Sequence, residues 1–111
     1  RIAVLTPAYP PFLNLPPFHG AALEAVHLAQ CTSGTELRFE IEFRRLAAAL
    51  AKPDTRLLLL CNPHNPSGRC WSRADLRRIA LLCDEHDVLL CSDEVWGELP
   101  LHPASAPFTS A

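Results

Sequence analysis

The chain contains 111 residues, 49% of them hydrophobic, and carries a formal net charge of −2 at pH 7. A chain of this length can bury one modest hydrophobic core, and its nearly balanced charge argues against nucleic acid or an anionic membrane as a partner. The sequence shows neither an apolar run of the roughly 20 residues that cross a bilayer nor the pattern of a secretory signal peptide. We therefore expect a globular protein located in the cytoplasm.

The N-terminal segment predicts a strand followed by a proline-rich loop. Residues 2–6 (IAVLT) form a short apolar run that is typical of a buried strand, and Pro7 ends it. Residues 9–20 contain prolines at positions 10, 11, 16 and 17, which argues against an ordinary helix there. A short helical turn that begins at Pro10 or Pro11 is allowed, because proline is tolerated in a first turn.

The next segment combines an ambiguous run, a turn and a predicted helix. Residues 21–29 (AALEAVHLA) suit a helix by propensity, with a strand as the alternative. Residues 32–35 (TSGT) predict a turn. A helix is predicted over residues 40–51, ahead of Pro53, because the hydrophobic residues there repeat with helical spacing.

The segment from Leu57 to Glu98 is the one around which the rest of the chain is organised. Residues 57–61 (LLLLC) and 88–91 (VLLC) are continuous apolar runs, which suit strands that are buried on both faces. The apolar residues between them recur with helical spacing, and Ser72 with Asp75 resembles a capping box at the start of that helix. A strand, helix and strand of this length predict a parallel crossover and therefore an α/β fold.

Two polar segments follow the two predicted strands. Residues 62–68 (NPHNPSG) follow the first strand and residues 92–94 (SDE) follow the second. Because parallel strands end at the same edge of a sheet, we expect both segments at one site, at the edge where open α/β sheets bind ligands. The residues after Trp96 are rich in proline and small side chains, which predicts an extended loop.

At these residues the sequence resembles the fold-type-I enzymes that depend on pyridoxal 5′-phosphate (PLP), the class I/II aminotransferase superfamily. The paired NPHNPSG and SDE loops carry the resemblance, which covers nearly all of the chain. The segments TPAYPPF (residues 6–12) and LLCNP (residues 59–63) are most similar to the MalY/PatB branch, the cystathionine β-lyase-like C–S lyases. The resemblance implies part of a three-layer α/β/α major domain with a mainly parallel sheet, in which residues 21–29 form a strand.

The resemblance also implies roles for individual residues in binding PLP. Asp93 matches the aspartate that pairs with the ring nitrogen of the cofactor and keeps it protonated. Asn65 matches the asparagine that hydrogen-bonds the phenolic oxygen, and Tyr9 matches the aromatic residue that stacks on the cofactor ring. Trp96 departs from the pattern, because relatives carry Tyr or His at this position, either of which can hydrogen-bond the cofactor oxygen.

Each of these residues also has a purely structural interpretation. Asp93 can cap a helix or end a strand in solvent, and Asn65 can organise a turn before a proline. Tyr9 can be a core tyrosine beside prolines, and Trp96 can serve packing alone.

Other parts of such an enzyme are expected to lie outside this chain. The superfamily has a phosphate-binding loop that would precede Arg1 and a Schiff-base lysine that would follow the SDE strand, so no catalytic residue is expected here. Lys52, the only lysine, lies between a predicted helix and Pro53, which places it at the opposite, amino edge of the sheet. The start at Arg1 and the absence of methionine also favour a piece of a longer protein, with residues 1–111 forming part of its PLP-binding large domain.

The expected function of the intact protein is that of a PLP-dependent enzyme acting on amino acids. The resemblance favours elimination at the C–S bond of cystathionine or cysteine S-conjugates, with transamination as the alternative, and it implies a homodimer. A non-catalytic or degenerate α/β module is the alternative from another class, and Trp96 motivates it. A nucleotide-binding domain is disfavoured, because no glycine-rich phosphate loop follows any predicted strand.

The cysteines favour free thiols in a reducing compartment, since their number is odd and CxxC spacing is absent. Cys61, Cys83 and Cys91 fall in predicted core elements. Cys61, His64 and Cys70 form a C-x2-H-x5-C pattern, but a structural zinc site uses four ligands and the sequence offers no convincing fourth nearby. We therefore expect no metal.

Overall fold

The centre of the molecule is a parallel sheet, seen in a computed structural model that describes residues 1–99 and 108–111. Its strands are β1 (Ile2–Thr6), β2 (Leu23–His27), β5 (Leu57–Cys61) and β6 (Leu89–Asp93). They lie in the order β2-β1-β5-β6, and each pairs with its neighbour in parallel register. This confirms the predicted parallel crossover and the strand that the resemblance implied within residues 21–29.

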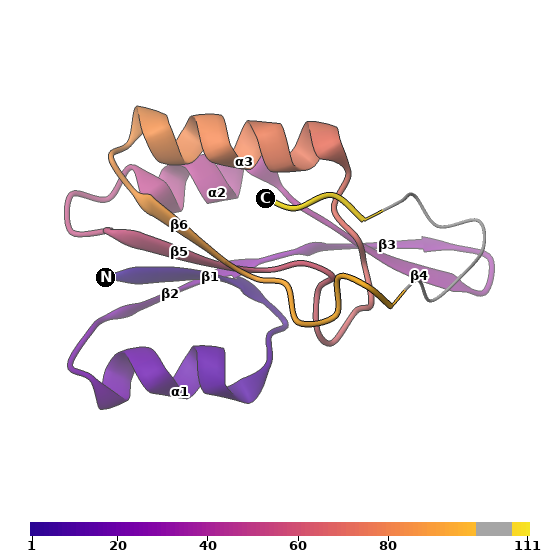
Figure 1. Cartoon of the computed structure of the whole chain (residues 1–111), viewed down its shortest axis with the longest axis horizontal. Helices are drawn as coiled ribbons and strands as arrows, with labels where there is room; N and C mark the ends of the chain where they lie inside the picture. Colours follow the sequence, from indigo (N-terminus) through magenta and orange to yellow (C-terminus); the bar gives the residue numbers. More distant parts are fainter. Residues whose placement is uncertain (100–107) are drawn as a thin grey trace.

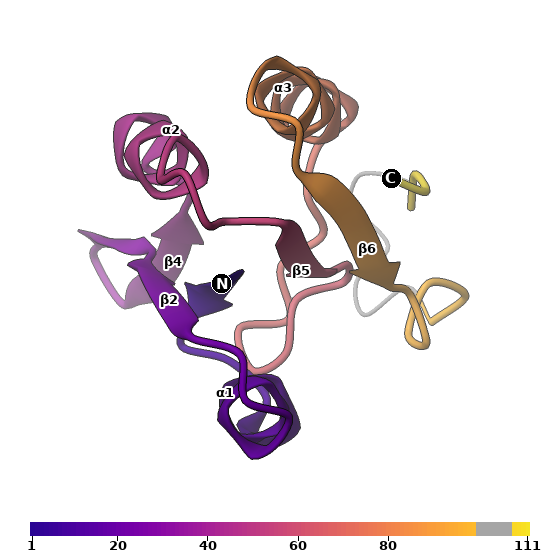
Figure 2. The ribbon, with the colours of Figure 1, turned by 90° about the vertical axis from the view of Figure 1, so that its left-hand side faces the viewer.

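Helices cover both faces of this sheet. Helices α2 (Phe43–Leu50) and α3 (Arg73–Glu85) lie on one side and α1 (Pro10–Phe18) lies on the other (Figure 1, Figure 2). The three-layer α/β/α arrangement is therefore confirmed. Within the two described ranges, no helix has both the length and the apolar character of a membrane-spanning segment.

The hydrophobic core lies between the sheet and helices α2 and α3. Leu58 and Leu60 of β5, Leu46 and Leu50 of α2 and Ile79 of α3 are all at most 1% exposed. Burying a side chain of this size stabilises the fold by about 1.5–3 kcal/mol relative to leaving it in water. This core therefore supplies a large share of the stability.

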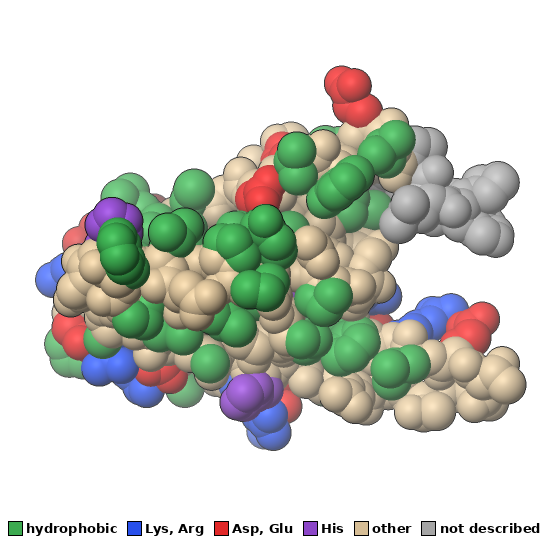
Figure 3. All heavy atoms as spheres, turned by 90° about the horizontal axis from the view of Figure 1, so that it is seen from below, with side chains coloured by type: hydrophobic (Ala, Val, Ile, Leu, Met, Phe, Trp, Pro, Cys, Tyr) green, Lys and Arg blue, Asp and Glu red, His purple; other side chains and the backbone are tan. Residues whose placement is uncertain are grey.

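The opposite face, which carries α1, is more open. Figure 3 shows hydrophobic side chains gathered over a broad area of this face. Leu15 and Phe18 of α1 are 51% and 83% exposed. Among the described residues, this layer is thus the less completely buried of the two.

Strand β6 is buried on one face only, which corrects the prediction that residues 88–91 are covered on both faces. Leu89 is 74% exposed and Cys91 is also exposed, whereas Leu90 packs against the core. The reason is that α3 packs on the face of β6 that carries Leu90, and among the described residues the face that carries Leu89 is left exposed. The strand also extends to Asp93, so this carboxylate closes the strand instead of following it.

Helix α1 passes through the proline-rich segment, where the sequence argued against an ordinary helix. Pro10 and Pro11 occupy its first positions, where a missing N–H group has no helical partner in any case. Pro16 and Pro17 lie inside the helix, where each removes one backbone hydrogen bond to the preceding turn, and the helix nevertheless continues to Phe18. The prediction was wrong because it treated the later prolines as breaks in a helix interior.

A two-stranded antiparallel hairpin, which the sequence pattern did not reveal, projects from the body of the molecule (Figure 1). Its strands β3 (Ala29–Ser33) and β4 (Glu36–Glu40) pair around Gly34, inside the predicted turn. Gly34 has a φ of 59°, which glycine adopts without strain. Because β4 occupies the residues before it, α2 begins at Phe43, later than predicted.

Helix α3 begins with the predicted cap. The Ser72 hydroxyl accepts a hydrogen bond from the Asp75 N–H over 3.1 Å, and the Asp75 carboxylate accepts one from the Ser72 N–H over 3.2 Å. An N-terminal cap of this kind stabilises a helix by about 0.5–2 kcal/mol. The cap also fixes the point at which the loop after β5 ends.

The cysteines are free in the described residues, and their burial differs from the prediction at one position. Cys61 and Cys83 are buried, whereas Cys91 is exposed on the uncovered face of β6. Burial raises the pKa of the Cys83 thiol to about 11, so this side chain acts as a small hydrophobic group. No cluster of potential metal ligands occurs within residues 1–99 and 108–111.

Candidate functional site

The carboxyl ends of β5 and β6 lie side by side. Cys61 is opposite Asp93 in the parallel register of the two strands, and the Asn62 N–H donates to the Asp93 carbonyl over 2.9 Å. The strands run in the same direction, so the loops that follow them leave from one edge of the sheet (Figure 1). The strand geometry on which the predicted site depends is therefore confirmed.

Asn62 anchors the loop that follows β5. Its side chain is fully buried and uses both ends of its amide: Nδ2 donates to the Thr109 carbonyl over 2.8 Å, and Oδ1 accepts from the Trp71 N–H over 3.3 Å. A buried amide is tolerated when its polar atoms are paired in this way. Asn62 therefore helps to set the geometry of this loop.

The rest of this loop folds back on itself. The His64 N–H donates to the Arg69 carbonyl over 2.8 Å, and the Gly68 N–H donates to the His64 carbonyl over 2.7 Å. Trp71, which is 2% exposed, donates its indole N–H to the Cys61 carbonyl over 2.9 Å. Gly68 has a φ of 69°, a conformation that favours glycine. The loop is thus held in one shape by its own backbone.

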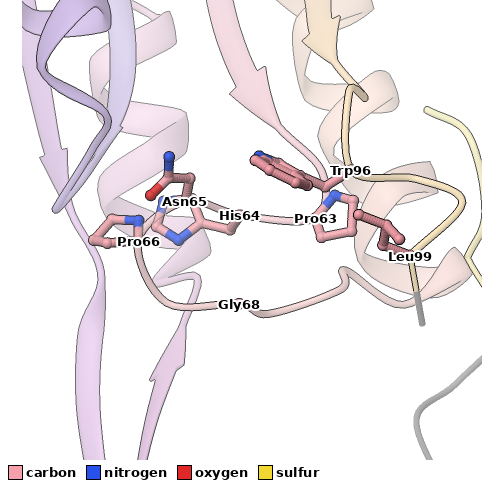
Figure 4. Close-up of a pocket in the computed structure, with 7 residues that line it drawn as sticks. All are labelled: Pro63, His64, Asn65, Pro66, Gly68, Trp96 and Leu99. Carbon is pink, nitrogen blue, oxygen red and sulfur yellow. The ribbon is translucent and has the colours of Figure 1, made fainter. Parts of the chain in front are cut away.

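A pocket of about 210 Å³ opens at this edge of the sheet (Figure 4). Its lining residues come from the loop after β5 and from the turn after β6: Pro63, His64, Asn65, Pro66, Gly68, Trp96 and Leu99. Asn65 and Trp96, which the sequence had singled out, therefore line the same pocket. Trp96 is 50% exposed.

Asp93 lies at the same edge but is not among the residues that line this pocket. Its Oδ1 accepts a hydrogen bond from the Val95 N–H over 3.1 Å, which is a turn contact. This contact fits the structural alternative for Asp93, and it also fixes the direction of the carboxylate. Only one of the two carboxylate oxygens takes part in it.

Tyr9 follows β1, whose carboxyl end belongs to the same edge, and it precedes the first residue of α1. Its side chain is 47% exposed, and its ring meets the edge of the Phe12 ring with the centroids 6.4 Å apart. The alternative of a core tyrosine is therefore wrong. Tyr9 lies at this edge of the sheet but is not among the residues that line the pocket.

Cys61 has a position in the site that the sequence analysis missed. Its buried thiol donates to the Pro63 carbonyl over 3.2 Å, and its sulfur accepts from the Asn65 N–H over 3.4 Å. Burial raises the pKa of this thiol, although the Asn65 N–H opposes the shift. A neutral thiol thus helps to hold the backbone of Asn65, and the only available signal was its place as the last residue of a strand.

Lys52 lies at the other edge of the sheet, as predicted. Its Nζ is 2.7 Å from the Glu24 carboxylate, near the start of β2, and Arg1 at the start of β1 pairs with the same carboxylate over 3.2 Å. The position of Lys52 at the amino edge excludes it from the pocket at the carboxyl edge.

A parallel sheet with helices on both faces and polar loops around a pocket at its carboxyl edge defines an α/β ligand-binding domain. Within that class the sequence is specific. Residues 1–108 match the family described as aminotransferase class I and II, and the chain belongs to this family.

Individual relatives confirm the resemblance to the PatB and MalY branch. The chain is 37% identical over 111 residues to cystathionine beta-lyase PatB from Bacillus subtilis, covering 99% of this chain and 28% of that protein. It is 35% identical over 109 residues to protein MalY from Escherichia coli, covering 94% of this chain and 27% of that protein.

A solved structure shows the same arrangement. Cystalysin from Treponema denticola, which contains a pyridoxal 5′-phosphate cofactor, matches with a TM-score of 0.82 and 27% identity over 95% of this chain and 26% of that one. The chain thus spans about a quarter of the length of these relatives.

Proposed function

We propose that this chain forms part of the cofactor domain of a PLP-dependent enzyme that acts on amino acids. The observation that carries the proposal is the placement of Asn65 in the loop after β5 and of Asp93 at the end of β6, the adjacent parallel strand, at one edge of the sheet. Family membership and the similarity to a PLP-containing structure support it.

The residues at this edge fit the chemical groups of PLP. The Asp93 carboxylate can pair with a protonated ring nitrogen, and the Asn65 amide can donate to a phenolic oxygen without adding charge. Tyr9 and Trp96 offer exposed aromatic surfaces that can pack against a flat ring. When bound, PLP supplies an electron sink for the electron pair left by removal of the α-proton of an amino acid.

The residues of this chain would bind and orient, and none would act as the proton-transferring base. Asp93 would keep the ring nitrogen protonated by charge pairing. Asn65 would orient the ring by donating a hydrogen bond to its phenolic oxygen. Lys52 is paired with Glu24 at the amino edge and is excluded from the role of the Schiff-base lysine. We therefore expect that lysine, and a phosphate-binding loop, in other parts of the complete protein.

Trp96 lines the proposed site at a position where the resemblance implies Tyr or His. An indole can donate a hydrogen bond but cannot accept one, and its side chain lines the pocket opposite the Asn65 loop (Figure 4). We propose that Trp96 contributes mainly surface contact to the cofactor ring. This surface contact would take the place of the hydrogen bond that Tyr or His would make to the cofactor oxygen.

Elimination at a C–S bond is the reaction we favour. The similarity to cystathionine beta-lyase PatB extends over 99% of the chain, which supports this choice. Transamination is the second candidate, because the family itself is described by that activity. In either case we propose an amino acid substrate, a cytoplasmic location and a homodimeric enzyme.

The complete protein that contains this chain provides the direct test. Purified protein should take up PLP with a visible absorbance change, and cystathionine should yield pyruvate, ammonia and a thiol in equal amounts. Amino group transfer to a keto acid without thiol release would identify the aminotransferase instead. Absence of PLP uptake by the correctly folded protein would contradict the proposed function.

A second experiment tests the position of Lys52. The isolated residues 1–111 are incubated with PLP and treated with borohydride, which fixes any lysine adduct. We expect no stable adduct on Lys52, and the complete Lys52→Met variant should keep its full turnover. A Lys52 adduct together with turnover of a cysteine S-conjugate by residues 1–111 would overturn the assignment.

A further inference from the structure

His64 is a buried, polar residue in the loop that carries Asn65, and the proposed binding roles do not use it. Its side chain is 2% exposed and its ring lies 5.5 Å from the Trp71 ring, at an angle of 52°. Its Nδ1 is 2.7 Å from the Ser67 hydroxyl. The ring is therefore fixed in position by packing and by one strong hydrogen bond.

The other ring nitrogen, Nε2, is buried and has no hydrogen-bond partner within residues 1–99 and 108–111. An unpaired buried polar atom is costly and calls for an explanation. Burial lowers the pKa of His64, whereas the backbone carbonyls of Pro7 and Leu5 oppose this shift. The ring is thus neutral, and these carbonyls favour a proton on the nitrogen that faces them.

The hydrogen bonds around Ser67 indicate which nitrogen carries that proton. The Ser67 oxygen accepts from the Arg69 N–H over 3.4 Å, so its own hydrogen is free to be donated to Nδ1 of His64. If Ser67 donates this hydrogen, Nδ1 is the acceptor and the proton of a neutral imidazole is on Nε2, which is the tautomer used in the proposal below.

The strand order explains why this proton matters for the site. Strand β1 pairs with β5 in parallel, with Val4 opposite Leu59. The segment that leaves β1 towards Tyr9 therefore starts beside the segment that leaves β5 towards His64 and Asn65. A ring between these two segments can set the distance between them.

We propose that His64 is a positioning residue whose Nε2–H ties the backbone of residues 5–7 to the loop after β5, and thereby sets the spacing of Tyr9 and Asn65. This inference rests on the proposed function, in which Tyr9 and Asn65 contact one cofactor ring. A small shift that completes the bond from Nε2 to a carbonyl is favoured, because it removes an unpaired buried N–H.

Substitutions that mimic one ring nitrogen at a time test the proposal in the complete protein. The amide nitrogen of Gln can replace Nε2, whereas Asn reaches only as far as Nδ1. We expect His64→Gln to bind PLP within about threefold of wild type, and His64→Asn to bind it about tenfold more weakly, as the loss of one hydrogen bond implies. The visible circular dichroism of bound PLP should change in His64→Asn and return in His64→Gln. His86→Asn, in a histidine that caps α3 at the far edge, is the matched control.

A second readout does not depend on the cofactor. Nitrogen NMR of the protein labelled in histidine, with His64 assigned from the signal lost in His64→Gln, should show a protonated Nε2 and an unprotonated Nδ1 without PLP. A proton on Nδ1 would overturn the inference. Equal PLP affinities of His64→Gln and His64→Asn would also overturn it, provided that the wild type binds PLP. Failure of the wild type itself to bind PLP would instead overturn the proposed function.

Discussion

The two edges of the central sheet handle polar groups in different ways. At the amino edge, Arg1 pairs with Asp54 over 3.0 Å and with Glu24 over 3.2 Å, and Lys52 pairs with Glu24 over 2.7 Å. At the carboxyl edge, Asn62 and His64 are buried, neutral polar groups in the loop after β5, which lines a pocket. The charges of one edge are matched within the chain, whereas the other edge offers surface to a ligand.

The pKa shifts follow the same division. Hydrogen bonding to Asp54 raises the pKa of Arg1, and the same contact lowers the pKa of Asp54, so both groups stay charged in solvent. Burial instead lowers the pKa of His64 and raises that of Cys61, so both groups stay neutral. Ion pairs therefore hold the amino edge together, whereas hydrogen bonds of the neutral side chains Cys61, Asn62 and His64 shape the loop after β5.

The largest effect is expected for Trp71, a buried residue whose indole hydrogen-bonds the last residue of β5. Trp71→Ala removes a buried indole and the hydrogen bond that satisfies the Cys61 carbonyl. Replacement of a buried aromatic residue by alanine costs about 3–5 kcal/mol, and urea denaturation should show this loss. Trp96→Ala, in the other tryptophan, is the control: because Trp96 is half exposed, its stability should change by less than about 1 kcal/mol.

The second-largest effect is expected for Asp93 at the carboxyl edge, in contrast to Asp54 at the amino edge. Asp93→Asn keeps the size of the side chain and its acceptor for the Val95 N–H but removes the charge. In the proposed site the Asp93 charge raises the pKa of the cofactor's ring nitrogen, and a nearby opposite charge shifts a pKa by about 1–3 units. Because each pKa unit corresponds to about a factor of ten, kcat/KM of Asp93→Asn should fall about 10- to 1,000-fold.

Asp54→Asn is the control for this measurement. It removes an equal charge at the amino edge, where Asp54 contacts Arg1, and activity should stay within about twofold of wild type. Equal losses in the two variants would mean that the charge at position 93 has no special place in the reaction.

A pH effect is expected where the turn after β6 meets the C-terminal residues. Burial raises the pKa of Glu94, but the Ala111 N–H and the hydroxyls of Ser110 and Ser92 outweigh it and lower the pKa below its ordinary value of 4.5. A carboxylate with a lowered folded-state pKa stabilises the fold above its unfolded-state pKa. That stability is lost as the pH falls through the folded-state value.

Thermal melts at decreasing pH can isolate this contribution. Glu94→Gln should melt below wild type at pH 7, and the difference should shrink as the pH falls below 4.5. A difference that stays constant down to about pH 3 would show that the charge of Glu94 does not matter.

The crossover unit could be predicted from the sequence because its signals are local. The apolar run of β5, the cap at Ser72 and the helical repeat of α3 each appear within a few residues, and all three are confirmed. The burial of β6 could not be predicted in the same way. An apolar run does not reveal that its strand ends the sheet, so Leu89 and Cys91 were wrongly placed in a core.

The sequence predicted the sheet edge at which the candidate site lies, and it singled out two of the residues that line the pocket there. Parallel strands bring the Asn65 loop and Asp93 to one edge, as the paired loops indicated, and Asn65 and Trp96 line one pocket there. The roles of Cys61 and His64 were missed, because both depend on contacts with backbone groups of folded loops. Such contacts leave no periodic pattern in the sequence, and the C-x2-H-x5-C spacing was considered only as a zinc pattern that lacks a fourth ligand.

The smallest expected effect lies at the amino edge and tests whether its ion pairs serve only stability. Lys52→Met removes the pair with Glu24, whose side chain is 17% exposed while that of Lys52 is 45% exposed. Exposed pairs contribute about 0.2–1 kcal/mol, so urea denaturation should show a loss of this size. Added salt at about 1 M should reduce the difference by screening. PLP binding should be unchanged, because the substitution lies across the sheet from the pocket. A loss of PLP binding with stability intact would place Lys52 in the reaction and remove the distinction between the two edges.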